Sequence, residues 1–280
     1  MNDKAFIDIE KLIASKNPKL LKRMPRAIIR YLKYILHQQE INAFIEDHQH
    51  LKNAEWCQAV VDYLDITYHV KHLDRIPKDG KIVLAMNHPL GGMDAMILVS
   101  ALQNHRKDLK FIVNDLLMNL EQMKDMFVGV NKVRKSQNKN NPSVRILIQE
   151  LFQSEEAVCI FPAGLVSRKQ KGEVMDLAWK KTFVTYSKEF DRTIIPIYID
   201  GRLSEFFYRL SNFRKAIGIK TNIEMLYLAN ELFKQHERHF RFIVGEPIRA
   251  TELDPAIDDK EMAQQIKEKV YDLRKELNHD

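Results

Sequence analysis

A strand, a glycine-containing turn and an apolar helix are predicted in immediate succession by the stretch Ile82-Val83-Leu84-Ala85-Met86-Asn87-His88-Pro89-Leu90-Gly91-Gly92-Met93-Asp94. Its first five residues are apolar on both faces, which is typical of a central strand covered by helices on each side. Residues 93–103 then have the pattern of an apolar helix. In α/β proteins, functional side chains gather where a strand ends and the next helix begins. The turn at residues 87–92 is therefore a candidate site.

Short β-branched segments alternate with longer helical patterns from about residue 54 to the end of the chain. Further strands are predicted at residues 66–70, 109–113, 157–161, 193–199 and 240–244, and further helices at 115–124, 142–153, 176–189, 222–237 and 258–277. The stretch Ile194-Ile195-Pro196-Ile197-Tyr198 is apolar on both faces, as a central strand should be, although a proline within a strand is best tolerated at an edge or a bulge. The pattern predicts an α/β fold with a mixed, largely parallel sheet flanked by helices.

The chain has 280 residues, 45% of them hydrophobic, which is enough for one large domain with a packed core. We expect helices alone in residues 1–53 and the main domain in residues 54–280. Cys57 and Cys159 are isolated, without C-x-x-C spacing, so a reducing compartment is expected. No signal peptide and no run of roughly 18 apolar residues is visible. Membrane contact, if any, is expected to be peripheral and at the cytoplasmic face.

Positive charge is concentrated at the start of the chain. Residues 1–40 hold nine Lys or Arg against four Asp or Glu, whereas the net charge of the whole chain is +6. Cations recur every three or four residues from Lys19 to His37, opposite an apolar face, and Pro25 is expected to divide the segment. This pattern fits a helix on an anionic membrane surface. It fits equally well a surface helix packed on the protein core.

A second segment mixes aromatic and basic residues, at Phe206, Phe207, Tyr208, Arg209, Leu210, Phe213, Arg214 and Lys215. Contact with a membrane or a carrier protein and packing of these aromatics in the core both remain open. The sequence pI near 9.1 also invites nucleic acid as a partner. No finger, RNA-binding or helix-turn-helix signature accompanies the charge, so no nucleic acid is expected.

His88 and Asp94 are the residues of the first turn that can carry chemistry. A carboxylate on one imidazole nitrogen fixes the tautomer and stabilises the imidazolium once the other nitrogen has taken a proton. His88 is thus a candidate general base for a hydroxyl, with Asp94 orienting it. A histidine that merely caps a turn is the alternative interpretation of this pair.

A second candidate turn follows the strand at 157–161, and it reads Phe161-Pro162-Ala163-Gly164-Leu165-Val166-Ser167-Arg168-Lys169. Its backbone N–H groups and Arg168 have the chemistry to bind a phosphate or a carboxylate. Without the first turn beside it, the segment would be interpreted as a loop with solvated charges.

The two turns together resemble the glycerolipid acyltransferase family of the lysophosphatidate type. That family's first block is Asn-His, four residues and Asp, and its third is Phe-Pro-Glu-Gly-Thr-Arg-Ser. The strand with an internal proline at 194–197 is similar to the fourth block, the turn at 245–248 to a late turn, and residues 128–134 loosely to the second block. The resemblance covers about residues 65–250.

Two departures from the family pattern matter. Five residues, not four, separate His88 from Asp94, and the paired glycines can absorb the extra residue in a wider turn. Ala163 replaces the family's Glu, and the arginine comes later, at Arg168 after Ser167. These variant blocks look more like the branch labelled hemolysin-like, which includes O-acyltransferases of bacterial ornithine and glycine lipids.

The resemblance implies an acyltransferase that moves a fatty acyl group from acyl carrier protein or acyl-CoA to the hydroxyl of a lysolipid, either a lyso-aminolipid or a lysophospholipid. It implies catalysis by His88 and Asp94. Substrate contacts are implied for Asn87, Gly91, Gly92, Arg134, Phe161, Pro162, Gly164, Ser167 and Arg168. No covalent acyl-enzyme is required, because neither cysteine has an evident basic partner and Ser167 lies outside a nucleophile elbow.

No metal and no cofactor is expected beyond the thioester co-substrate. The histidine pairs 48/50 and 69/72 lack an acidic or cysteine cluster that would complete a ligand set. Two other functions remain open. One is a non-catalytic lipid-binding or membrane-remodelling protein with the same fold, and the other is a hydrolase in which water replaces the acceptor.

Overall fold

A mixed seven-stranded sheet forms the centre of the computed structural model, which describes residues 6–113, 117–129 and 142–278. Its strands are β1 (Thr67–Lys71), β2 (Ile82–Met86), β3 (Leu109–Val113), β4 (Phe127–Gly129), β5 (Ala157–Ile160), β8 (Thr193–Asp200) and β9 (His239–Val244), in the spatial order β1-β9-β8-β2-β5-β3-β4. The five strands from β8 to β4 are parallel, and β9 runs antiparallel to β8 with β1 parallel to β9. The predicted fold class is confirmed.

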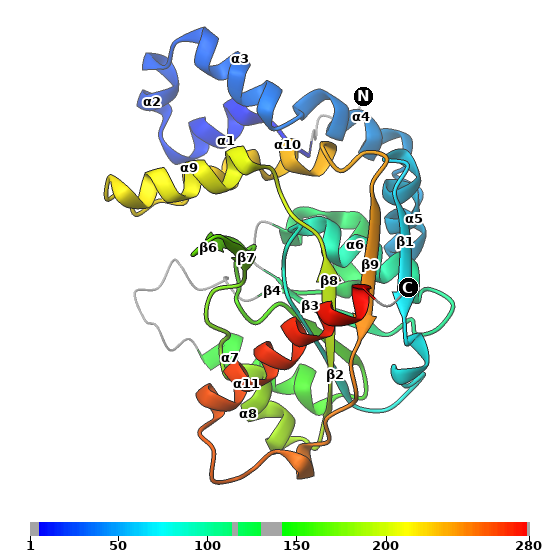
Figure 1. Cartoon of the computed structure of the whole chain (residues 1–280). Coiled ribbons are helices and arrows are strands. Elements are labelled where there is room, and N and C mark those ends of the chain that lie inside the picture. The colour runs from blue at the N-terminus through cyan, green and yellow to red at the C-terminus, as the bar shows by residue number, and fades with distance from the viewer. Residues whose placement is uncertain (1–5, 114–116, 130–141, 279–280) are drawn as a thin grey trace.

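Helices cover both faces of this sheet. Within the described residues, the α-helices are α1 (Ile9–Lys16), α2 (Pro18–Arg23), α3 (Arg26–Ile35), α4 (Gln38–Asp47), α5 (Asn53–Tyr63), α6 (Gly92–Leu102), α7 (Pro142–Gln153), α8 (Thr182–Glu189), α9 (Glu205–Ala216), α10 (Leu228–Phe233) and α11 (Asp259–Asp272). In Figure 1, α11 crosses in front of the sheet near α7 and α8, and α6 lies behind it.

The central strand β2 divides the core into two layers. Its residues Leu84 and Met86 belong to a cluster with α5 and α6, whereas Val83 and Ala85 belong to a cluster with α7, α8 and α11. All four side chains are completely buried. Because successive side chains of a strand point to opposite faces, both faces of β2 must be apolar, as the sequence predicted.

The N-terminal helices gather at one end of the molecule, above the sheet in Figure 1, and α9 and α10 lie beside them. Pro25 separates α2 from α3, as predicted. On α4, Phe44 is buried within the main core cluster, so the helical segment is joined to the sheet domain by packing. In the described part of the chain, no helix is long and apolar enough to cross a membrane.

Six strands were predicted within one residue at each end, whereas several helix predictions were wrong. Residues 117–126 form 3₁₀ turns in place of a helix, and the segment 222–237 is divided into a 3₁₀ helix, η4 (Ile223–Tyr227), and α10. The helix predicted from residue 176 begins only at Thr182. The short hairpin β6 (Arg168–Gln170) and β7 (Glu173–Met175), the strand β4 and the helix α9 were not predicted.

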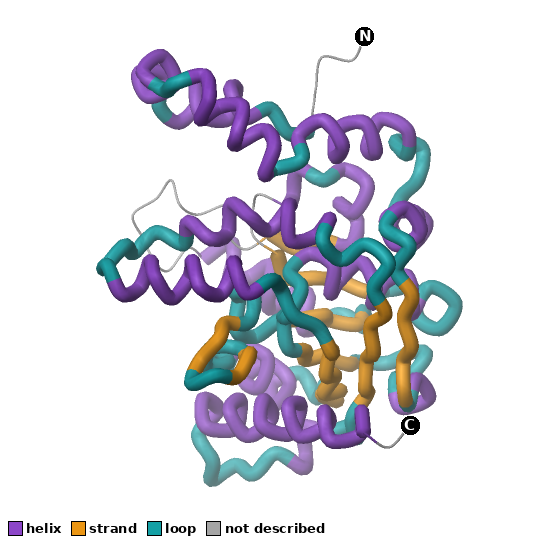
Figure 2. Tube along the Cα trace, turned by 45° about the horizontal axis from the view of Figure 1, so that its top comes forward, coloured by secondary structure: helices purple, strands orange, loops and turns teal. Residues whose placement is uncertain are grey.

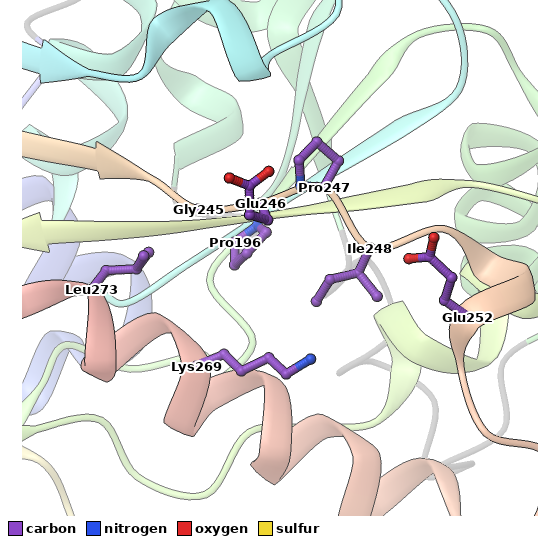
Figure 3. Close-up of a pocket in the computed structure, with 8 residues that line it drawn as sticks. All are labelled: Pro196, Gly245, Glu246, Pro247, Ile248, Glu252, Lys269 and Leu273. Atoms are coloured by element: carbon purple, nitrogen blue, oxygen red, sulfur yellow. The ribbon is translucent and has the colours of Figure 1, made fainter.

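Pro196 lies in the interior strand β8, which confirms the central position predicted for residues 194–198. It pairs with Ala85 of β2 on one side. On the other side β9 has already ended, and the carbonyl of Pro196 accepts from the Gly245 amide at 2.8 Å. A Cβ at Gly245 would lie 2.9 Å from the Pro196 ring, so this close approach requires glycine. Figure 3 shows the two residues side by side.

Candidate active site

The carboxyl ends of β2 and β5, which are neighbours in the sheet, bring the two predicted turns together. His88 follows β2, and its Nδ1 lies 2.9 Å from Oδ2 of Asp94 in the first turn of α6. The His88 side chain is 18% exposed and that of Asp94 is fully buried. The imidazole therefore has one nitrogen on a buried carboxylate, which is the arrangement of a general base with its orienting acid.

The wider turn between these two residues is closed by Gly91. Its φ of +70° is a conformation that residues with a Cβ rarely adopt, and a Cβ there would lie 3.3 Å from Val166. The Asp94 amide donates to the Gly91 carbonyl at 3.1 Å, and both Asp94 oxygens accept from the Leu90 amide. The extra residue relative to the family pattern is thus absorbed without loss of the His88–Asp94 contact.

Burial raises the pKa of Asp94 to about 6. The hydrogen bond and the charge of His88, together with the Leu90 amide, oppose this rise. Desolvation penalises the ionised carboxylate, and the imidazolium that forms during proton transfer offsets that penalty. Asp94 is therefore placed to stabilise the imidazolium that forms during the transfer.

The ring and the backbone groups of His88 also make contacts within the protein. Its ring stacks on that of Phe161, with centroids 4.1 Å apart. Its amide donates to Asp176 Oδ1 at 3.2 Å, and its carbonyl accepts from the Ser167 amide at 2.8 Å. Among the described residues, Nε2 has no hydrogen-bond partner. This nitrogen is available to a substrate hydroxyl.

Asp176 is the functional-site residue that sequence analysis missed. It is fully buried in the loop before α8, and its Oδ1 also accepts from Ser167 Oγ at 2.6 Å. Its Oδ2 accepts from Trp179 Nε1 at 2.9 Å. A carboxylate with three donors ties the second turn to the backbone of His88. The only signal in the sequence was an acidic residue three positions before a tryptophan, and the segment from Asp176 was interpreted as the start of a helix.

Three residues predicted to contact substrate are instead used within the protein. Asn87 continues the β2–β8 ladder, since its side chain accepts from the Ile199 amide at 2.7 Å and donates to the Ile199 carbonyl at 2.9 Å. Ser167 is buried against Asp176. Arg168 is 1% exposed, and its guanidinium donates to Glu224 at 3.0 Å. These side chains position the two turns.

The remaining predicted contacts differ in their surroundings. Phe161 lies on His88, and Pro162 is buried, with its carbonyl bonded to the Lys180 amide. The Gly164 amide is already bonded to the Phe161 carbonyl at 2.9 Å, so it is not a free oxyanion donor. Gly92, exposed at the start of α6, has no such bond among the described residues. Arg134 lies outside the described residues.

Two other features do not belong to the site. Asp65, His236 and Glu237 could together contact a cation, but all three are exposed, and none of them contacts His88 or Asp94. A pocket between α11 and the chain after β9 is lined by Pro196, Gly245, Glu246, Pro247, Ile248, Glu252, Lys269 and Leu273 (Figure 3). Because β9 is antiparallel to β8, this pocket lies toward the amino ends of β2 and β8, away from His88.

Comparisons with known proteins place the chain in a family. A family model described as Acyltransferase matches residues 11–280, so the chain belongs to the acyltransferase family. A lyso-glycine lipid O-acyltransferase of Phocaeicola vulgatus is 41% identical over 269 residues, covering 96% of this chain and 95% of that protein. The same-named protein of Bacteroides thetaiotaomicron is 40% identical, covering 96% and 97%. The crystal structure of the 1-acyl-sn-glycerophosphate acyltransferase PlsC from Thermotoga maritima superposes with a TM-score of 0.49 at 18% identity, covering 95% of this chain and 93% of that one.

Replacing Asp176 with asparagine tests its positioning role. An amide has one acceptor oxygen, so either Trp179 Nε1 or the His88 amide then faces an N–H group, at a cost of about 1–3 kcal/mol. We expect kcat to fall about 10- to 100-fold through displacement of His88, with little change in KM. Steady-state kinetics on folded protein measures this.

A second change, Trp179→Phe in the Asp176→Asn background, removes the indole N–H group that would face the NH₂ group of the asparagine. We expect it to restore part of the lost kcat. If Asp176 acts only on stability, kcat per folded molecule will be unchanged in Asp176→Asn and the double variant will only be less stable than either single variant.

Proposed function

We propose that the protein transfers a fatty acyl group from a thioester to the free hydroxyl of a lysolipid that carries a glycine or similar amino-acid head group. The observation that supports this most is the 2.9 Å contact of His88 with a fully buried Asp94, in a chain about 40% identical over nearly its whole length to proteins named for that reaction. The geometry accounts for activation of a hydroxyl.

In this mechanism the acceptor hydroxyl lies at His88 Nε2 and gives up its proton as its oxygen attacks the thioester carbonyl. Asp94 stabilises the imidazolium. The carbon–sulfur bond then breaks, and the thiolate takes the proton back from Nε2, leaving an ester and a free thiol. The amides of Gly91 and Gly92 at the start of α6 are our candidates for the oxyanion, where one donor typically contributes about 3 kcal/mol.

The head-group preference rests on what Arg168 does. In this chain the arginine of the third block is buried and bonded to Glu224, and Ala163 replaces the family's Glu. A guanidinium that is already paired with a carboxylate is not free to bind a phosphate. The site thus lacks the cation that a phosphate head group needs at this position, which favours an acceptor without a phosphate.

The donor in this proposal is acyl carrier protein or acyl-CoA, and the reaction takes place at the cytoplasmic face of the cell membrane, where the protein is peripheral. The N-terminal helices support the location. Leu20, Ile28, Tyr31 and Tyr34 on α2 and α3 are large, apolar and exposed. Residues 11–39 contain several cations and no Asp or Glu, so apolar burial and lipid phosphate attraction would act together.

An acceptor panel tests the substrate class. Purified protein receives an acyl thioester with a lyso-glycine lipid, a lyso-ornithine lipid or a lysophosphatidate, and kcat/KM is compared. We expect the glycine lipid to exceed the lysophosphatidate by at least about tenfold. Equal or better use of the lysophosphatidate would contradict the head-group assignment while leaving acyl transfer intact.

The raised pKa of Asp94 also predicts opposite effects of pH on activity and stability. As pH falls from 7 to 5, protonation of Asp94 removes its support of the imidazolium, so kcat/KM should fall. Stability should change the other way, because the folded state binds this proton more tightly than the unfolded state, whose carboxyl has the ordinary value of 3.8. The rise in the pKa of Asp94 corresponds to a change on the order of 3 kcal/mol in the free energy of unfolding between high and low pH.

The measurement is the Tm of the wild type against Asp94→Asn from pH 4 to 8. The variant lacks the ionised carboxylate, so its Tm relative to that of the wild type should be highest at pH 7–8. This difference in Tm should shrink below pH 6. A difference in Tm that stays constant across this range would show that Asp94 does not titrate there.

A further inference from the structure

The outer surface of α9 and the turn after it has an unusual composition. From residue 206 to residue 223 there is no Asp or Glu, while Arg209, Arg214, Lys215 and Lys220 are all basic. Arg214 is buried, whereas the other three cations are exposed. This segment therefore presents positive charge with no acid of its own.

Large apolar side chains lie among these cations. Phe206 is 48% exposed, Phe213 62% and Ile217 53%. Their spacing of seven and four residues places them on one stripe of the helix. Phe207 and Tyr208 lie on the opposite side of α9 and are buried. The sequence left open whether the aromatic residues of this segment contact a membrane or carrier protein or pack in the core. Phe207 and Tyr208 pack in the core, whereas Phe206 and Phe213 are exposed.

This surface lies on the same side of the molecule as α2 and α3. The hydroxyl of Tyr31 on α3 is 2.8 Å from that of Tyr227 on η4, and the Tyr227 ring packs on Phe206 with centroids 5.0 Å apart. Figures 1 and 2 both show α9 extending beside the N-terminal helices at one end of the protein. The exposed residues of α3 and α9 thus belong to one region.

A buried ion cluster ties this segment to the catalytic turns. Glu224 on η4 is completely buried between Arg168, at 3.0 Å, and Arg214 of α9, at 2.8 Å. Lys169 also pairs with Glu205 at the start of α9. Arg168 and Lys169 directly follow Ser167, whose amide holds His88. Anything that binds α9 is therefore held at a fixed position relative to the catalytic histidine.

We propose that the outer face of α9 and its following turn, residues 206–220, is a second membrane-binding surface that docks on an anionic lipid bilayer and holds the active site against it. This inference rests on the proposed action on a lipid acceptor. Exposed Phe and Ile side chains among cations match the acyl region and the phosphates of a bilayer. An acidic carrier protein would be attracted by the cations alone and would not need the apolar stripe.

Vesicle sedimentation tests this proposal with the full-length protein and vesicles of equal parts phosphatidylglycerol and phosphatidylcholine. The double variant Phe213→Ser/Ile217→Ser should lower the partition constant at least about tenfold. The matched control is Ile146→Ser/Leu147→Ser on α7, whose side chains are 50% and 41% exposed and lie outside this surface. We expect the control to bind vesicles like the wild type.

A variant with two fewer lysines tests the electrostatic contribution to vesicle binding. Lys215→Gln/Lys220→Gln should weaken binding to the anionic vesicles about fivefold per lysine and leave binding to pure phosphatidylcholine unchanged. Unchanged vesicle binding in both double variants would overturn the proposal. An increased KM for acyl carrier protein, with vesicle binding intact, would likewise overturn it and assign the surface to the carrier.

Failure of the membrane proposal can be told apart from failure of the proposed function. With a detergent-dispersed lipid acceptor, the α9 variants should keep wild-type kcat, because no catalytic contact is altered. If the wild type itself transfers no acyl group to any lipid under these conditions, the proposed function is wrong, whatever the vesicles show.

Discussion

Replacement of His88 by alanine is expected to lower kcat for acyl transfer by about 10²- to 10⁴-fold, the range typical of a lost general base. The physical reason is that Nε2 is the basic atom of the site left without a hydrogen-bond partner among the described residues. Asp94, Phe161, Asp176 and Ser167 use the remaining groups of this histidine. Steady-state transfer kinetics with saturating thioester and acceptor checks the prediction.

The control for this variant is His50→Ala, since His50 is exposed and lies in the turn between α4 and α5. It should retain wild-type kcat. Circular dichroism of His88→Ala should show a folded protein, because the ring of His88 is partly exposed and its removal opens the site toward solvent. Wild-type turnover by folded His88→Ala would remove His88 from the mechanism.

Asp94→Asn is expected to reduce kcat by about 10³-fold or more while keeping the protein folded. The neutral side chain of an asparagine cannot stabilise the imidazolium as the carboxylate does. Because the Leu90 amide contacts both Asp94 oxygens, it does not prevent the asparagine from presenting its NH₂ group to His88 Nδ1. The imidazole then carries its proton on Nε2, and that tautomer cannot accept a proton from the acceptor hydroxyl. The expected loss therefore comes from the lost charge and the wrong tautomer, without a large displacement of His88.

The comparison with Asp79→Asn, an exposed aspartate, separates this effect from a change in net charge. That control should be fully active. A loss of activity in Asp94→Asn that matches only a loss of folded protein would mean that the buried carboxylate is structural.

Much of the sheet could be predicted because its strands are buried on both faces. Val83 and Leu84 face different helical layers, so the strand has to be a continuous apolar run and is easy to recognise. The short hairpin β6–β7 could not be recognised in this way. Its first strand consists of basic and polar residues, and their places are set by long-range contacts, such as that of Arg168 with Glu224.

The His88–Asp94 pair was predictable because both residues lie in one local turn, and local spacing is visible in a sequence. The role of Asp176 was not, since its three partners come from different segments, and a Gln264 side chain bonded to both the amide and the carbonyl of Trp179 keeps the preceding loop out of helical geometry. The pairing of Arg168 with Glu224 was not predictable for the same reason. Whether an arginine is free or already paired depends on a glutamate 56 residues away.

The most direct test of the proposed mechanism is product analysis with a thioester radiolabelled in its acyl chain, a lyso-glycine lipid acceptor, and wild-type or His88→Ala protein. We expect the label to appear in an O-acylated lipid with the wild type, and this product to be almost absent with His88→Ala. Label recovered only as free fatty acid in the presence of the acceptor, or equal product from both proteins, would contradict it.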